Sequence, residues 1–278
     1  MYFCFIVEQQ YRNDRMPMVI VEQLRQWGHT VDVLEPHANV TCLSDLVTHR
    51  YDAYVLKTVS DGPGLSILEA AEAIGIPTIN HSRSIRQVRD KAVAAALAHA
   101  HGLPTPRTYF VAHRDLLQQI PEEDYPLVVK PTNGSSGRGI YRFNSSAELA
   151  TSTIDEADAH FFLAQHYIEN TGFDIKLYVM GKTVYSVAKK SPLHPEVDVD
   201  KRLIPITIEL RNLALQVGKV FGLDIYGLDV VETAQGLMMV DINDFPSFGQ
   251  VPQAIPRVSE HIICIAKRAE QQRHSKAQ

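Results

Sequence analysis

Short apolar runs alternate with stretches of helical spacing over the first 85 residues of the chain. Strand-like runs are expected at residues 2–7, 31–34, 53–57 and 77–80. Between them, helical spacing is found over residues 17–27 and 65–74, and each stretch stops at a glycine. Strands that alternate with helices in this way predict a parallel α/β sheet covering about residues 1–85. No G-x-G-x-x-G motif follows the first strand, so a dinucleotide site is not expected there.

The rest of the chain predicts two further parts in which paired strands dominate. An Ala-rich helix is expected over residues 84–102, with Ser84 as its N-cap and Gly102 as its C-cap. Further strands are expected at 107–111, 127–129, 140–143 and 161–167, and as hairpins at 175–179 with 184–188 and at 226–232 with 237–241. Further helices are expected at 145–155, 206–221 and 258–269, followed by a frayed polar tail. We therefore divide the chain into an N-terminal α/β part (1–85), a central lobe (86–165) and a C-terminal lobe (166–278).

Composition narrows the class of protein. With 45% hydrophobic and 21% charged residues, the 278-residue chain is typical of a soluble globular enzyme. A formal net charge of −5 argues against a general nucleic-acid binder. No apolar run approaches membrane-spanning length, and the start MYFCFIVEQQ lacks the positive region of a signal peptide. Three widely spaced cysteines have no metal-ligand spacing and are typical of reduced thiols. We expect a cytoplasmic protein, monomeric or homo-oligomeric, with no nucleic-acid or membrane partner.

The stretch 127–143, LVVKPTNGSSGRGIYRF, places a flexible loop between two strand-like runs, with Lys130 at its mouth. Glycines let backbone N–H groups approach phosphate oxygens closely, and a lysine adds a point charge. The pattern therefore predicts a polyphosphate site, although it lacks the Gly-Lys-Ser/Thr of the Walker motif. The candidate residues are Lys130, Ser135, Ser136, Gly137 and Gly139. The alternatives are an ordinary turn and a lysine whose head group lies at the surface.

A second constellation lies late in the chain. Asp229 interrupts one apolar strand of the second hairpin (YGLDVVE), and Asp241 and Asn243 close the other (VDIND). An unpartnered buried carboxylate is costly, so a cation is expected beside these side chains. Oxygen ligands that are partly carboxylate suit Mg²⁺ bridging ATP phosphates. The alternative is one turn aspartate and one solvated aspartate.

The segment AQHYIE at 164–169 is similar to a hinge strand whose backbone pairs with an adenine edge. Its candidate nucleotide-binding residues are Gln165, Tyr167 and Ile168. Either Glu169 or Asp174 is a candidate acceptor for the ribose hydroxyls, and either could instead be a surface carboxylate.

Basic residues are dispersed through the chain. Lys57 and Lys176 follow or interrupt apolar strands, a position that favours lining a cleft, and Lys189 and Lys190 end another strand. If they converge, they suit a small anionic substrate. The alternative is that these lysines are scattered, solvated charges. Arg83 and His194 are further members of this basic set, and we expect both to be solvated. Lys91 is a second candidate phosphate-binding lysine, although a lone helical lysine is usually solvated.

Together these pieces resemble the ATP-grasp superfamily over nearly the whole chain. The matching segments are RDK (89–91), VVKP (128–131), NGSSGRGI (133–140), AQHYIE (164–169), DIKLYVMG (174–181), GLDVVE (227–232) and VDINDFPSFG (240–249). The resemblance implies an α/β and α+β protein: an N-terminal parallel α/β subdomain followed by two α+β lobes that clamp ATP. It also implies Lys91 and Lys130 on the phosphates, Mg²⁺ on Asp229, Asp241 and Asn243, and ATP and Mg²⁺ as cofactors.

Two branches of the superfamily share these motifs. RimK-type carboxylate–amine ligases are similar in the loop and hinge, but typically carry Arg at the position of Lys176 and Glu at that of Asp241. ATP-grasp inositol-polyphosphate kinases resemble this chain in KLYVMG, AKKSPL, the D-I-N-x-F-P ending, and LKTVSD around Lys57, which implies substrate contacts for that lysine.

The chemistry of the two branches differs. A ligase stabilises a developing oxyanion, for which a rigid bidentate Arg is suited, whereas phosphoryl transfer needs Mg²⁺ and point charges. The lysines favour a kinase that transfers the γ-phosphate to a phosphorylated polyol such as an inositol phosphate. In that reaction Lys176, with Lys189 or Lys190, neutralises the transferring group, and Lys57, Lys176 and Asn243 contact the substrate. The alternative is a RimK-like peptide-bond-forming ligase that acts through an acyl phosphate.

Overall fold

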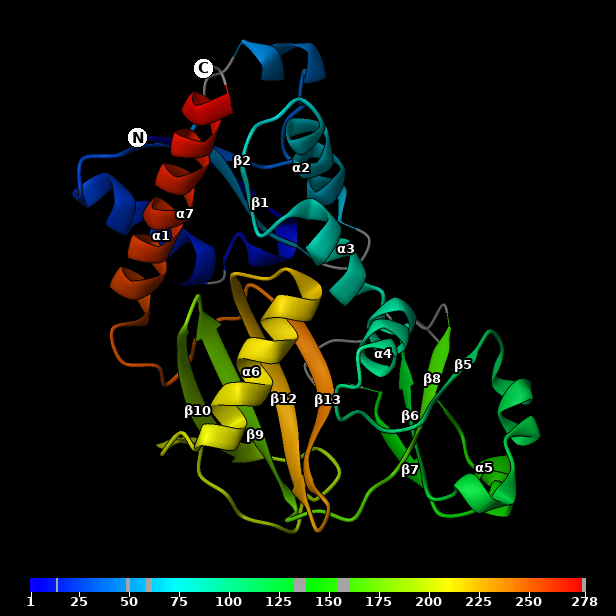
Figure 1. Cartoon of the computed structure of the whole chain (residues 1–278). Coiled ribbons are helices and arrows are strands. Elements are labelled where there is room, and N and C mark those ends of the chain that lie inside the picture. Colours follow the sequence, from blue (N-terminus) through cyan, green and yellow to red (C-terminus); the bar gives the residue numbers. More distant parts are fainter. Residues whose placement is uncertain (14, 49–50, 59–61, 133–138, 155–160, 277–278) are drawn as a thin grey trace.

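The computed structural model describes residues 1–13, 15–48, 51–58, 62–132, 139–154 and 161–276. A parallel sheet forms the N-terminal part, as the alternation of strands and helices predicts (Figure 1). Its strands, in spatial order, are β2 (Thr30–Leu34), β1 (Tyr2–Val7), β3 (Ala53–Lys57) and β4 (Thr78–Ile79).

Alternate residues of β1 pack on opposite faces of this sheet, because successive side chains of a strand point to opposite sides. Phe3 and Phe5 pack with α1 (Arg15–Gln26) and α7 (Ala254–Lys276), whereas Cys4 and Ile6 pack with α2 (Pro63–Ala73). Figure 1 shows α7, at the end of the chain, lying beside α1. The expected frayed tail is wrong, because α7 continues to Lys276 rather than ending near residue 269.

The expected continuous helix over residues 84–102 is wrong, because the structure contains two helices there. α3 (Ser82–Arg89) ends at Asp90, whose φ of −82° and ψ of 100° are extended, and α4 (Lys91–Ala100) follows at once. The Asp90 carboxylate accepts hydrogen bonds from the backbone N–H groups of Ala92 and Val93, at 3.0 and 3.1 Å. Asp90 is therefore the N-cap of the Ala-rich helix, and this break positions Lys91 at the first turn of α4.

The central lobe contains an antiparallel sheet. Its strands, in spatial order, are β5 (Thr108–Val111), β8 (Phe162–His166), β6 (Leu127–Pro131) and β7 (Tyr141–Phe143). The helix α5 (Ser146–Thr151) is shorter than expected, and its N-cap is Ser145, whose side chain accepts from the N–H of Glu148. The 3₁₀ helices of the described chain are η1 (Gln9–Tyr11), η2 (Leu43–Val47), η3 (Arg114–Gln119) and η4 (Glu122–Asp124).

The C-terminal lobe contains a second antiparallel sheet, and the two predicted hairpins form its centre. Its strands, in spatial order, are β11 (Arg202–Ile204), β10 (Thr183–Lys190), β9 (Phe173–Met180), β12 (Ile225–Thr233) and β13 (Gly236–Asp244). Helix α6 (Ile208–Phe221) covers one face of this sheet (Figure 1). It packs there against side chains such as Leu177 and Leu228. Lys176 and Asp229 are the immediate sequence neighbours of Leu177 and Leu228, so they belong to the opposite face of the sheet.

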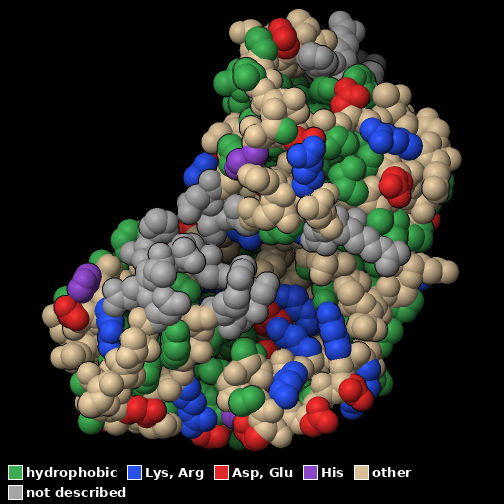
Figure 2. Space-filling view, turned by 180° about the vertical axis from the view of Figure 1, so that it is seen from behind, with side chains coloured by type: hydrophobic (Ala, Val, Ile, Leu, Met, Phe, Trp, Pro, Cys, Tyr) green, Lys and Arg blue, Asp and Glu red, His purple; other side chains and the backbone are tan. Residues whose placement is uncertain are grey.

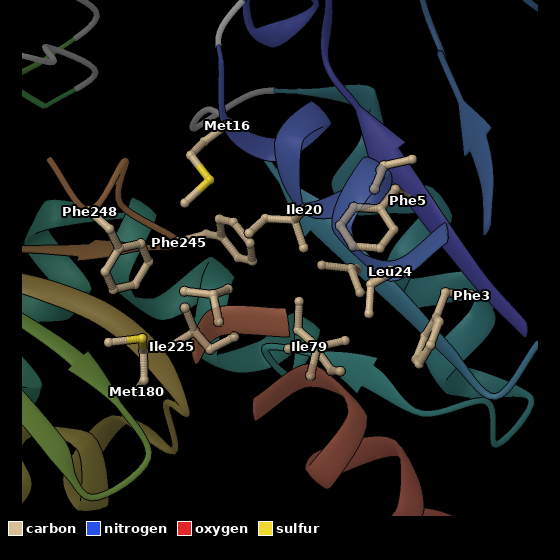
Figure 3. Close-up of a cluster of buried hydrophobic side chains, with 14 of the residues drawn as sticks. Phe3, Phe5, Met16, Ile20, Leu24, Ile79, Met180, Ile225, Phe245 and Phe248 are labelled. Carbon is tan, nitrogen blue, oxygen red and sulfur yellow. The ribbon is translucent and has the colours of Figure 1, made fainter. Parts of the chain in front are cut away.

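The N-terminal sheet packs directly on the C-terminal lobe. Ile79, Met180, Ile225, Phe245 and Phe248 lie in one buried cluster with side chains of β1 and α1 (Figure 3). The three expected parts of the chain each contain one sheet, and their boundaries at 85 and 165 remain a prediction. No helix of the described residues has the length and hydropathy required to span a membrane.

Asn80 links the N-terminal sheet to the C-terminal lobe through hydrogen bonds. Its buried side chain accepts from the N–H groups of Asp224 and Ile225, both at 2.9 Å, and donates to the Ile225 carbonyl at 2.7 Å. Asn80→Ala leaves buried backbone groups without these partners, so we expect a loss of about 2–4 kcal/mol in the free energy of unfolding. Chemical denaturation measures the loss, with exposed Asn39→Ala as the control. Equal stability of both variants would contradict this role.

Candidate functional site

A β-bulge shapes the polar end of the site. Asp229 and Asp241 lie opposite each other on β12 and β13, but the next pair is Val230 with Met239, so Val240 has no partner in the register. A bulge turns the unpaired residue out of the ladder. The Val240 carbonyl accepts a hydrogen bond from Lys130 Nζ at 2.9 Å, which joins β6 of the central lobe to the C-terminal hairpin.

Lysines surround the two aspartates. Lys91 Nζ lies 2.8 Å from Asp241 Oδ1, and Lys176 Nζ lies 2.9 Å from Asp229 Oδ2. Lys189 Nζ lies 2.9 Å from Asp229 Oδ1. Burial opposes ionisation of both aspartates, but the neighbouring ammonium groups outweigh it and hold the pKa of Asp229 and of Asp241 below the ordinary range. Both carboxylates are therefore charged at neutral pH.

Lys130 is the buried cation of this set. Burial lowers the pKa of Lys130 to about 8, Asp241 opposes that loss of charge, and Lys91 adds to it. An ammonium that has lost its water shell is stabilised by any anion that reaches it. A phosphate group bound beside Lys130 would therefore stabilise the protonated form of this lysine.

The predicted metal ligands lie on neighbouring strands and carry the oxygen atoms that Mg²⁺ prefers. Asp229 and Asp241 face each other on neighbouring strands, and Asn243 follows two residues along β13, on the same side of the sheet as Asp241. Among the described residues, no group of three or more His, Cys, Asp and Glu side chains has metal-binding geometry. The third protein ligand would therefore be the amide oxygen of Asn243, which fits a hard oxygen-seeking cation.

A cleft extends from these charges between the two antiparallel sheets, and its empty volume is about 990 Å³, including space open to solvent. Figure 2 shows a hollow in the surface, with basic and acidic side chains gathered in it. Lys91, Lys130, Lys189, Asp229 and Asp241 line its polar end. The rest of the lining includes the apolar side chains Val128, Ile140, Ile168, Leu193, Val231 and Met238. The cleft thus offers charged contacts for a phosphate and apolar contacts for a flat ring.

The structure brings several other predicted residues to this cleft. Gln165, Tyr167, Ile168 and Asp174 line it. Asp174 Oδ2 lies 3.5 Å from Lys189 Nζ, and burial raises the pKa of Asp174 despite that neighbour. Asp174 is therefore the better placed of the two candidate ribose acceptors.

Other predicted residues lie apart from the lining. Glu169 is exposed and pairs with Arg142 at 3.5 Å, and Lys190 is exposed beside Lys189. Lys57 is buried at the end of β3, with its Nζ 4.7 Å from the centre of the Tyr11 ring. Gly139 begins the described chain after the loop, with a φ of 69°. The loop candidates Ser135, Ser136 and Gly137 lie outside the described residues.

The sequence reasoning missed one buried ion pair beside the site. Arg89 Nε lies 2.5 Å from Asp244 Oδ1, and Asp244 is fully buried. Arg89 and Lys91 flank the helix break, while Asp244 and Asp241 belong to the end of β13, so two ion pairs attach the break to the end of that strand. The motifs RDK and VDIND contain both residues of this pair, Arg89 and Asp244, and neither residue was assigned a role from the sequence.

The sheets and the cleft define the class of protein. A parallel α/β part followed by two antiparallel lobes that enclose a charged cleft is the ATP-grasp fold, as the sequence predicts. The family model described as "RimK-like ATP-grasp domain" matches residues 88–256. The chain therefore belongs to the RimK-like ATP-grasp family.

Known proteins resemble the chain over most of its length. Probable alpha-L-glutamate ligases are 25% identical over 251 residues in Vibrio vulnificus (strain YJ016), covering 82% of each chain, and 27% identical over 252 residues in Serratia proteamaculans (strain 568), covering 82% and 83%. The ATP-grasp ligase PsnB, complexed with a minimal precursor, Mg and ADP, has a TM-score of 0.71 at 18% identity, covering 95% of this chain and 98% of its own. The D-cycloserine synthetase DcsG has a TM-score of 0.70 at 21% identity, covering 97% and 100%.

These likenesses support an ATP-grasp enzyme of the ligase class. The expectation of a kinase finds no support among them. The alternative, a RimK-like carboxylate–amine ligase, is the one that they favour.

Proposed function

We propose that the protein is an ATP- and Mg²⁺-dependent carboxylate–amine ligase that acts through an acyl phosphate. The observation that carries the proposal is the polar end of the cleft in a RimK-like ATP-grasp chain. There, Asp229 and Asp241 face each other and are held ionised by lysines. This arrangement supplies both a cation site and a field of positive charge for phosphates.

Different residues of the cleft bind the phosphates and the metal. Lys91 and Lys130 hold the phosphates of ATP, and Asp229, Asp241 and Asn243 hold Mg²⁺, which neutralises charge on those phosphates when bound. A carboxylate oxygen of one substrate attacks the γ-phosphorus, and ADP leaves. The amine nitrogen of the second substrate then attacks the acyl carbon, loses a proton, and inorganic phosphate leaves. Lys176 and Lys189 neutralise the carboxylate before transfer and the phosphate afterwards.

The acceptor is proposed to be anionic, in keeping with the lysines around the polar end. The relatives named alpha-L-glutamate ligases suggest glutamate as the amine substrate. A carboxylate on a small molecule or on a peptide end is suited to the cleft, and PsnB is a neighbour that was solved with a precursor peptide. Contacts from Lys57 to the substrate, a cytoplasmic location, and a monomeric or homo-oligomeric state remain predictions.

One observation favours a kinase as the second candidate. Among the described residues that line the cleft, Lys91, Lys130 and Lys189 supply the positive charge and no arginine does, and Lys176 pairs with Asp229 beside them. Lysines act as point charges, which suit phosphoryl transfer to an alcohol, whereas a rigid arginine fork suits an oxyanion.

³¹P NMR of the purified protein with Mg²⁺ and ATP distinguishes the two reactions. We supply one pool of amino acids with small carboxylates and a second pool of inositol phosphates. ADP and inorganic phosphate that appear only when a carboxylate and an amine are both present support the ligase. A new phosphomonoester signal beside ADP, formed from the second pool, would establish the kinase and overturn the main proposal.

A further inference from the structure

Two segments that are distant in sequence contribute apolar side chains to the cleft. Ile168 belongs to the hinge after β8, and Leu193 belongs to the connection between β10 and β11. Both side chains line the same cleft, so the space available to a flat ring depends on how these segments are held relative to each other. The residues next to them in sequence are Tyr167 and His194.

Tyr167 and His194 join the two segments directly. The Tyr167 hydroxyl lies 2.9 Å from His194 Nε2, and the Tyr167 side chain is buried. His194 Nδ1 lies 3.1 Å from Glu196 Oε1, which orients the ring. His194 is therefore not the solvated charge that the sequence predicts.

The backbone also brings these segments together. Gly172, with a φ of +82°, follows the hinge, and a Cβ atom placed on it would lie 2.9 Å from Val197 Cγ2. A contact this close leaves no room for a side chain, so the connection lies against the chain that leaves the hinge. The Tyr167–His194 contact is thus the polar part of a packed interface.

Arg142 approaches the same tyrosine from the central lobe. Its guanidinium carbon lies 3.7 Å from the centre of the Tyr167 ring, within the range of a cation–π contact. Arg142 belongs to β7, the strand that follows the glycine- and serine-rich loop. Tyr167 therefore contacts the strand after that loop and the connection after β10, and it belongs to the hinge itself.

We propose that the Tyr167–His194 pair determines nucleobase specificity by fixing the position of the base between Ile168 and Leu193. The inference rests on the proposed use of ATP and assigns the pair a positioning role. A base held at one depth presents its edge to the hinge backbone in one register, and adenine and guanine differ in the donor and acceptor groups of that edge. If the hinge and the β10–β11 connection can move relative to each other, the cleft accommodates either edge. Discrimination between adenine and guanine then falls even when the phosphate contacts are unchanged.

The test measures binding of the adenine nucleotide analogue AMPPNP and of its guanine counterpart GMPPNP, each with Mg²⁺, by calorimetry. Tyr167→Phe and His194→Ala each remove the same contact. We expect either variant to bind AMPPNP about three- to tenfold more weakly, in keeping with the loss of one hydrogen bond. The preference for AMPPNP over GMPPNP is expected to fall, and the double variant to bind like the single variants, because both remove one interaction.

Matched controls separate this role from a general loss of stability. Tyr109→Phe removes a hydroxyl that bonds to Asp124 in the same lobe, and His113→Ala removes an exposed histidine of the η3 turn. Neither control should change the preference. An unchanged preference in Tyr167→Phe and His194→Ala would overturn the inference, as would equal weakening for both nucleotides or additive losses in the double variant.

Because binding is measured without turnover, the outcome does not depend on which reaction the enzyme catalyses. If the wild type binds AMPPNP but forms no amide, the proposed ligase fails while the specificity role is still decided by the nucleotide preference. If the wild type binds neither nucleotide, both proposals are overturned.

Discussion

Replacing Asp241 with asparagine is expected to abolish ATP-dependent turnover while leaving the fold intact. The substitution keeps the shape of the side chain but removes a charged metal ligand and the partner of Lys91 at 2.8 Å. It also removes the carboxylate that opposes the loss of charge on Lys130. Loss of several kcal/mol of electrostatic stabilisation corresponds to a fall in kcat of about 10³-fold or more.

The measurement is the rate of ADP release under saturating ATP and Mg²⁺, with the melting temperature recorded alongside. Asp115→Asn, at an exposed position on η3, is the matched control and should retain wild-type activity. If Asp241→Asn stays within about tenfold of the wild-type rate, the assignment of Asp241 to the metal is wrong. A similar fall in both variants would indicate damage to the fold instead.

The sequence predicts the fold well where local pattern and tertiary packing agree. The hairpins around Gly181 and Gly236 follow from apolar alternation that ends at a turn residue, and both glycines have positive φ values of 59° and 113°. The break at Asp90 was missed because helical spacing continues on both sides of it. An N-cap aspartate followed by an Ala-rich run is a start signal, and it should have outweighed that continuity.

The candidate site is less accessible to sequence reasoning, because its contacts depend on distant segments meeting. The convergence of Asp229 and Asp241 follows from hairpin register alone. That Lys130 bonds to Val240 depends on a bulge, and no residue pattern near Val240 marks it. His194 was expected to be solvated as one of several basic residues dispersed in the sequence, yet it contacts Tyr167, which lies 27 positions away. Arg89 and Asp244 are separated by most of the chain, so their pairing requires the packed structure.

Replacing Lys130 with methionine is expected to weaken binding of AMPPNP with Mg²⁺ by about 10- to 100-fold, which corresponds to the loss of one charge-assisted contact to phosphate. Methionine fills a similar volume at the end of β6 without the ammonium group. Lys182→Met, at the exposed turn between β9 and β10, is the matched control and should bind like the wild type. Calorimetry at pH 7 gives both dissociation constants, and equal affinity in Lys130→Met would remove Lys130 from the phosphate site.

The same residue predicts how binding depends on pH. Burial lowers the pKa of Lys130 to about 8, so the free protein carries the ammonium below that pH and loses it as the pH rises. Nucleotide phosphate titrates near pH 6 and stays fully charged over this range. Affinity should therefore fall by only about twofold from pH 7 to 8 and by up to about tenfold per pH unit above it. Lys130→Met has no such proton to lose, so its weaker affinity should not change between pH 7 and 9. A wild-type profile that stays flat to pH 9 would show that the proton on Lys130 plays no part in binding.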